Sequence, residues 1–149
     1  MDYFVKFLIQ VVLSYIGTAG FGLIINIPKR ALNLAGWSGT IGWLTYWVLF
    51  EAGTGRMFAN LIAGISVGIC GIIFAHIKRM PVILFNIPGL VPLVPGATAY
   101  QAVSSLVLGN FDKAIALIVK VSMVAGAIAT GFMIAQIIGE WYYKTQLKL

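Results

Sequence analysis

Residues 85–100 read FNIPGLVPLVPGATAY and hold three of the five prolines of the chain. A proline lacks the amide hydrogen that a helix needs, and in a helix interior it costs about 3 kcal/mol. A regular helix is therefore not expected to run through prolines 88, 92 and 95. We expect the segment 81–109 to be helical but broken, with a second half-helix that runs from about residue 96 to residue 108.

The composition around this stretch indicates a membrane protein. Of 149 residues, 60% are hydrophobic and only 9% are charged, whereas soluble domains are about half apolar and about a quarter charged. Ten basic and four acidic side chains cannot cover the surface of a soluble globule of this size. A soluble enzyme and a disordered chain are excluded, and so is a disulfide scaffold, because there is a single cysteine, Cys70. The fold class expected is an all-α integral membrane protein.

Five apolar segments are long enough to cross a bilayer, which takes about 20 helical residues. The first is interpreted as a retained helix and not as a signal peptide, because it lacks a basic start and a cleavage site. All five belong to one transmembrane domain, and the fourth is the one broken by prolines. Their approximate spans are 4–25, 28–50, 57–77, 81–109 and 114–138.

The basic residues fall between these segments, so the net charge of +6 indicates orientation and not nucleic-acid binding. If 81–109 crosses once, six basic residues lie on one side and three or four on the other; if it is re-entrant, the tally is five against four or five. Five crossings are favoured. This predicts a bacterial plasma (inner) membrane protein with its N-terminus outside and its C-terminus in the cytoplasm. The larger group is Lys29, Arg30, Lys78, Arg79, Lys144 and Lys148, and the smaller is Lys6, Arg56, Lys113 and, if it snorkels, Lys120.

The second segment carries two structural signals. Asn26 is a reasonable N-cap, and Pro28 suits the first turn of a helix. Gly36, Gly39 and Gly42 recur every three residues, and without Cβ atoms they allow another helix to approach closely. We expect this face to pack against a helix, including one from a partner subunit.

The broken segment is where we expect a binding site. Unwound backbone at membrane depth is tolerated only when it is buried in protein or lines a wet cavity, and such breaks form substrate sites in transporters. The half-helix would offer free N–H groups to a carboxylate, and Lys120 either helps to hold an anion or snorkels to the interface. Alternatively, the prolines only mark a kink or an interfacial loop. The candidate substrate-binding residues are Asn86, Pro88, Pro92, Pro95, Gly96, Thr98 and Lys120.

No pattern indicates an enzyme or a cofactor. His76 is the only histidine and has no ligand-type neighbour at metal-binding spacing, so a metal site is not expected. A phosphate-binding loop is missing, which argues against ATP hydrolysis by this chain. Glu51 and Arg56 are interpreted as a solvated turn.

Two stretches resemble the threonine/serine exporter family. They are the proline-rich run 88–100 and the stretch 21–32, FGLIINIPKRAL, followed by the glycine spacing described above. The chain is similar to the small subunit of two-component exporters. The matching positions are Asn26, Pro28, Pro88, Pro92, Pro95 and Gly96.

The resemblance implies export of a small carboxylated metabolite together with a larger membrane subunit. Threonine and serine are implied for the amino-acid branch, and succinate-type dicarboxylates for the two-component branch. The residues alone leave a second function open, a non-transporting scaffold or stabilising subunit whose glycine faces dock a partner that holds the whole site.

Overall fold

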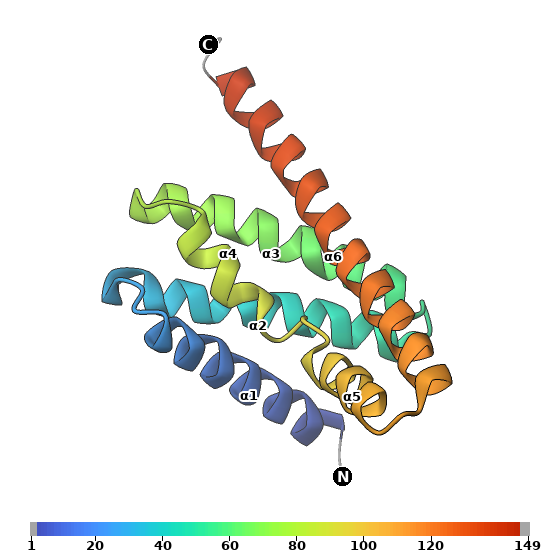
Figure 1. Cartoon of the computed structure of the whole chain (residues 1–149). Coiled ribbons are helices and arrows are strands. Elements are labelled where there is room, and N and C mark those ends of the chain that lie inside the picture. Colours follow the sequence, from blue (N-terminus) through green and yellow to red (C-terminus); the bar gives the residue numbers. More distant parts are fainter. Residues whose placement is uncertain (1–2, 147–149) are drawn as a thin grey trace.

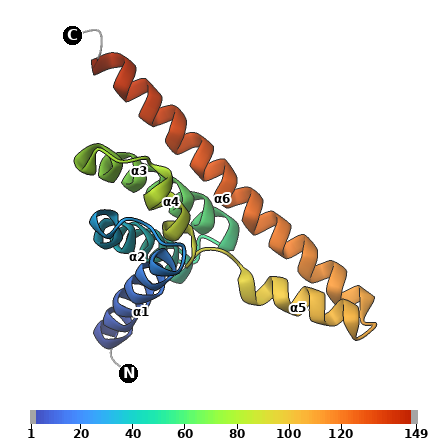
Figure 2. The same cartoon turned by 60° about the vertical axis from the view of Figure 1, so that its left-hand side comes forward.

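The computed structural model describes residues 3–146, with side chains as far as Trp141, and the regular secondary structure within them is all helical. Helices α1 to α3 lie side by side, alternating in direction, and α4 packs between α2 and α3 (Figure 1). Helix α6 crosses α3, and α5 extends away from the first four helices and packs on α6 alone (Figure 2). The helices are α1 (Tyr3–Ile24), α2 (Lys29–Glu51), α3 (Arg56–Lys78), α4 (Ile83–Leu90), α5 (Gly96–Val107) and α6 (Phe111–Gln146).

Three helices in the described part of the chain are long and apolar enough to cross a membrane: α1, α3 and the Phe111–Trp141 part of α6. Helix α2 has the length of a crossing, but glycines and polar residues interrupt its apolar side chains. Helices α4 and α5, with 8 and 12 residues, are each too short to cross alone. The all-helical class is thus shown, while the map of five crossings stays a prediction.

The segment 81–109 forms two helices joined by residues 91–95. Helix α4 begins where α3 ends, and α5 runs on to the other end of the stack, where α6 begins (Figure 1). Pro92 and Pro95 lie in the connection, but Pro88 lies inside α4, contrary to the prediction that a helix would not run through it. In so short a helix Pro88 removes only one bond, the one to the carbonyl of Leu84, so the helix continues for two more residues.

Asn26 ends α1 instead of capping α2, so the predicted N-cap is wrong. It adopts the left-handed conformation (φ 57°), its N–H donates to the Leu23 carbonyl, and the N–H of Ile27 donates to the Gly22 carbonyl, both at 3.0 Å. This pair of bonds is a Schellman motif, in which asparagine is the usual substitute for glycine. The N-cap of α2 is Pro28, which makes no side-chain capping bond.

The glycine face of α2 is occupied by helices of the same chain. A Cβ on Gly36 would lie 2.7 Å from the Tyr15 ring, and one on Gly39 would collide with Thr18, so α1 packs directly on both glycines. A Cβ on Gly42 would collide with Val67 of α3, so α3 packs directly on this glycine. The expectation that this face docks a partner subunit is therefore corrected, because α1 and α3 already cover these three positions.

Helices α3 and α6 touch backbone to backbone where they cross. A Cβ on Gly64 would lie 2.8 Å from the carbonyl oxygen of Ile128, and one on Gly131 would meet the backbone of α3. Helix α6 has 36 residues and is longer than the predicted span 114–138. At 1.5 Å per residue it extends for about 54 Å, more than the hydrocarbon core of a bilayer.

Candidate functional site

A pocket of about 240 Å³ lies at the connection between α4 and α5, and we call it the break pocket. Its walls come from α2, the start of α3, the stretch 92–98 and α6. Five of the seven predicted substrate-binding residues line it, although the sequence places one of them far from the others. They are Pro92, Pro95, Gly96, Thr98 and Lys120. The tertiary structure brings them together, and their role in substrate binding stays a prediction.

The other two predicted residues lie on α4, outside the break pocket. Pro88 is fully buried, and Asn86 packs against Gly71 of α3 so closely that a Cβ there would collide with it. The side-chain oxygen of Asn86 is buried without a hydrogen-bond partner. Both residues face the helices that enclose α4 in this conformation, and their role in substrate binding stays a prediction.

The first turn of α5 presents hydrogen-bond donors to the break pocket. The N–H of Gly96 donates to the Val94 carbonyl (2.8 Å), whereas the N–H groups of Ala97 and Thr98 have no backbone acceptor within residues 3–146. The N-cap residue Pro95 makes no side-chain bond to them. The helix dipole adds positive potential at this end, and half-buried Thr98 adds a hydroxyl group. This turn suits a carboxylate.

Two cations line the break pocket, Arg56 from α3 and Lys120 from α6. The lining contains no carboxylate side chain. Arg56 is exposed. Its guanidinium lies 5.8 Å from the centroid of the Phe50 ring, and this cation–π contact favours one orientation of the arginine side chain. Both cations also line an adjoining pocket of about 280 Å³. The site is therefore electropositive.

The sequence interpretation missed Arg56 as a site residue, and it also missed the aromatic and amide side chains of the lining, Trp43, Tyr46 and Asn60. Asn60 is 3% exposed, and its amide donates to the Arg56 carbonyl at 2.8 Å. The indole N–H of Trp43 donates to Gln10 of α1 at 2.6 Å. Only helical spacing could have indicated that these residues lie together. Trp43 and Tyr46 are three residues apart on one helix face, and Asn60 follows Arg56 by four residues.

The arrangement suits a small anion. It combines two cations, two N–H groups without backbone acceptors, a hydroxyl group and an aromatic wall in a space sized for a metabolite of a few carbon atoms. Within residues 3–141 no group of three or more His, Cys, Asp or Glu side chains is placed to hold a metal ion.

Comparison with known proteins identifies the family. The sequence profile described as Threonine/Serine exporter matches residues 10–138, so the chain belongs to the threonine/serine exporter family, and the resemblance found in the sequence is confirmed. This is a family of membrane transporters and not of enzymes.

One relative is an uncharacterized protein of Haemophilus influenzae, which is 26% identical over 137 residues. The match takes in 87% of this chain but 46% of the relative, so this chain spans about half the length of that protein. No solved structure matches the chain.

Proposed function

We propose that this member of the threonine/serine exporter family is the membrane subunit of a secondary exporter for small carboxylated metabolites, working with a larger membrane subunit. The observation that carries the proposal is the break pocket, where the free N–H groups of α5 meet Arg56 and Lys120. Transport by alternating access requires that the stretch 91–98 change its position relative to α3 and α6. An ion or proton gradient would supply the energy.

The charges of the break pocket favour a dicarboxylate such as succinate over threonine or serine. A dicarboxylate carries two negative charges, which match Arg56 and Lys120. A zwitterionic amino acid brings an ammonium group, and the break pocket has no carboxylate side chain to receive it. The ammonium group would instead be repelled by the two cations.

We also propose that 81–109 crosses the membrane once. The path of α4 and α5 from one end of the helical stack to the other supports this topology (Figure 1). Lys29 and Arg30 lie at the same end as Lys78 and Arg79, and the positive-inside rule places that end in the cytoplasm of a bacterium. Lys144 and Lys148, which enter the sequence tally, lie outside the residues whose side chains are described.

The exposed face of α5 supports a membrane partner. Tyr100, Val103 and Val107 are 75%, 60% and 81% exposed, and α5 contacts no helix except α6. The match covers 46% of the Haemophilus influenzae relative, so that protein has a further segment beside the part that resembles this chain.

Efflux from proteoliposomes tests the proposal. Vesicles are loaded with labelled succinate, threonine or serine and contain this chain alone or together with the larger family member from the same organism. We expect succinate efflux only with both chains. If no label leaves in either case, export of these metabolites is refuted, and a non-transporting scaffold becomes the favoured function unless a transport pathway is shown independently.

A matched pair of lysine variants on α6 tests the site itself. Lys120 lines the break pocket, whereas Lys113 lies near the start of the same helix and does not. Because Lys120 is exposed, its attraction for a carboxylate at contact distance is about 1 kcal/mol. Lys120→Met should raise the succinate KM about five-fold, and Lys120→Arg and Lys113→Met should leave it near the parent value. Equal effects of Lys120→Met and Lys113→Met would remove Lys120 from the site.

A further inference from the structure

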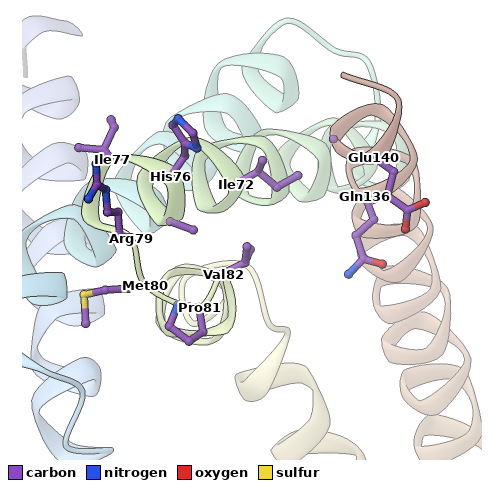
Figure 3. Close-up of a pocket in the computed structure, with 11 residues that line it drawn as sticks. Ile72, His76, Ile77, Arg79, Met80, Pro81, Val82, Gln136 and Glu140 are labelled. Atoms are coloured by element: carbon purple, nitrogen blue, oxygen red, sulfur yellow. The ribbon is translucent and has the colours of Figure 1, made fainter. Parts of the chain in front are cut away.

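A larger pocket lies at the other end of α3, and we call it the α3-end pocket. Its volume is about 1060 Å³. Figure 3 shows His76 and Arg79 at the end of α3, Pro81 and Val82 on the turn into α4, and Gln136 and Glu140 on α6.

The same three elements line both pockets. Each is bounded by α3, by α6 and by the segment that runs from Pro81 to Thr98. The break pocket uses Arg56 and Asn60 in the first two turns of α3, and the α3-end pocket begins at Ile72. Twelve residues separate Asn60 from Ile72, which corresponds to about 18 Å along a helix. The pockets therefore lie at opposite ends of one line along α3.

A buried apolar cluster lies between them, and we call it the gate cluster. It contains Ala63 and Val67 of α3, Leu93 of the connection, and Val124 and Ile128 of α6, all of which are buried. A hydrophobic constriction of this kind excludes a charged solute because the solute would lose its hydration. Leu93 and Val124 also line the break pocket, so the cluster begins directly at the wall of that pocket.

The packing of α4 is suited to movement. The side-chain oxygens of Asn86 on α4 and of Ser38 on α2 are buried without hydrogen-bond partners. Asn86 packs on Gly71, and a Cβ on Gly89 of α4 would lie 2.8 Å from the Ser38 oxygen. Unpaired buried oxygens make this packing costly. The small residues at these two contacts favour a shift of α4, which would also displace the fully buried Phe85 of α4 from Phe74 of α3. Such a shift would move Leu93 out of the gate cluster.

We infer that the α3-end pocket is the vestibule through which the carboxylate enters, and that the gate cluster separates it from the break pocket in the present closed conformation. The vestibule has more than four times the volume of the break pocket, and Arg79 and Glu140 give it mixed charge. It therefore conducts a hydrated anion without holding it, and the anion is bound only in the break pocket. The inference rests on the proposed function.

Cysteine accessibility in the native membrane, with the partner subunit present, tests the inference. The single native thiol is first removed by Cys70→Ala. One cysteine is then introduced by Gln136→Cys for the vestibule or by Thr98→Cys for the break pocket. A charged, membrane-impermeant thiol reagent is applied from each side. We expect Gln136→Cys to react from the side where α3 ends and Thr98→Cys to react from the other side. Labelling of both from the same side would overturn the inference.

Two isoleucines of α6 provide a matched pair for the gate. Ile128 belongs to the gate cluster and is 6% exposed, whereas Ile137 is 67% exposed and outside it. Ile128→Ala should let the reagent reach Thr98→Cys from the vestibule side at least ten-fold faster, and Ile137→Ala should not. Leu93→Ala repeats the test if Ile128→Ala fails to reach the membrane. Equal rates in the gate and control variants would contradict a gate at this cluster.

Labelling needs no substrate, so it tests the vestibule and the gate independently of the proposed export function. The expected sidedness without efflux of any tested metabolite would leave the pathway intact and refute the proposed substrates. Efflux together with same-sided labelling would support the exporter and refute this vestibule.

Discussion

The crossing of α3 and α6 gives a sharp test of the packing that holds the break pocket and the gate cluster together. The change is Gly131→Ala on α6. Its Cβ would collide with the carbonyl oxygen of Leu61 and would lie 3.0 Å from the amide nitrogen of Ile65 and 3.2 Å from the carbonyl carbon of Gly64. All three atoms belong to the backbone of α3, so no side chain can rotate away and the two helices must separate.

Gly126→Ala on the same helix is the matched control, because nothing lies within 4 Å of its Cβ position. Both substitutions gain about 1 kcal/mol of helix propensity. Only Gly131→Ala also causes overpacking, which typically lowers the free energy of unfolding by about 1–3 kcal/mol. The propensity gain is common to both variants, so the difference in their free energies of unfolding measures the packing term alone.

Thermal unfolding in detergent, followed by circular dichroism, measures that difference. Gly126→Ala should melt at or above the parent temperature. Gly131→Ala should melt below Gly126→Ala by about 2–4 °C for each kcal/mol of overpacking. Equal melting temperatures of the two variants would refute the close crossing of α3 and α6, and with it the shared walls of the two pockets.

Three further changes test the site and the corrected packing. Thr98→Ala should raise the substrate KM about ten-fold because a hydroxyl bonded to a carboxylate contributes about 1.5 kcal/mol. The amount of protein in the membrane should not change. Unchanged kinetics would remove Thr98 from the site. Gly39→Leu should lower the yield of folded chain because α1 packs on Gly39. Gly17→Leu should leave the yield unchanged because there is open space at its Cβ position. Equal yields from the two variants would contradict this packing. Asn26→Gly should preserve or raise the melting temperature. Asn26→Val should lower the free energy of unfolding by about 1–2 kcal/mol, and the melting temperature with it, because a β-branched residue resists positive φ. Equal melting temperatures of the two variants would exclude strain at this position.

Local chemistry explains why much of the fold was predictable. Apolar runs of about 20 residues are helical in a bilayer because no water is present to satisfy the backbone. The half-helix expected over 96–108 lies within one residue of α5 (Gly96–Val107) because helix ends depend on neighbouring prolines and glycines. Pro88 lies inside α4, contrary to the expectation, because burial of α4 between α2 and α3 outweighs the cost of one lost backbone bond.

The candidate site was only partly predictable because its walls come from four separate elements. The contiguous stretch 92–98 was found from its prolines, and Lys120 from its charge in an apolar span. Arg56 and Asn60 carry no local mark that distinguishes them from residues of an ordinary helix start. Their part in the break pocket depends on how α3 packs against α6, which no local pattern encodes.

Composition and the family match over residues 10–138 are properties read along the chain, so the sequence was enough to identify an all-helical membrane protein of the threonine/serine exporter family. Only the tertiary structure decided which cations face the break, that α1 and α3 occupy the glycine face of α2, and that Asn86 is enclosed against α3. These are contacts between residues far apart in sequence, and they are settled by the close approach of helix backbones at small residues.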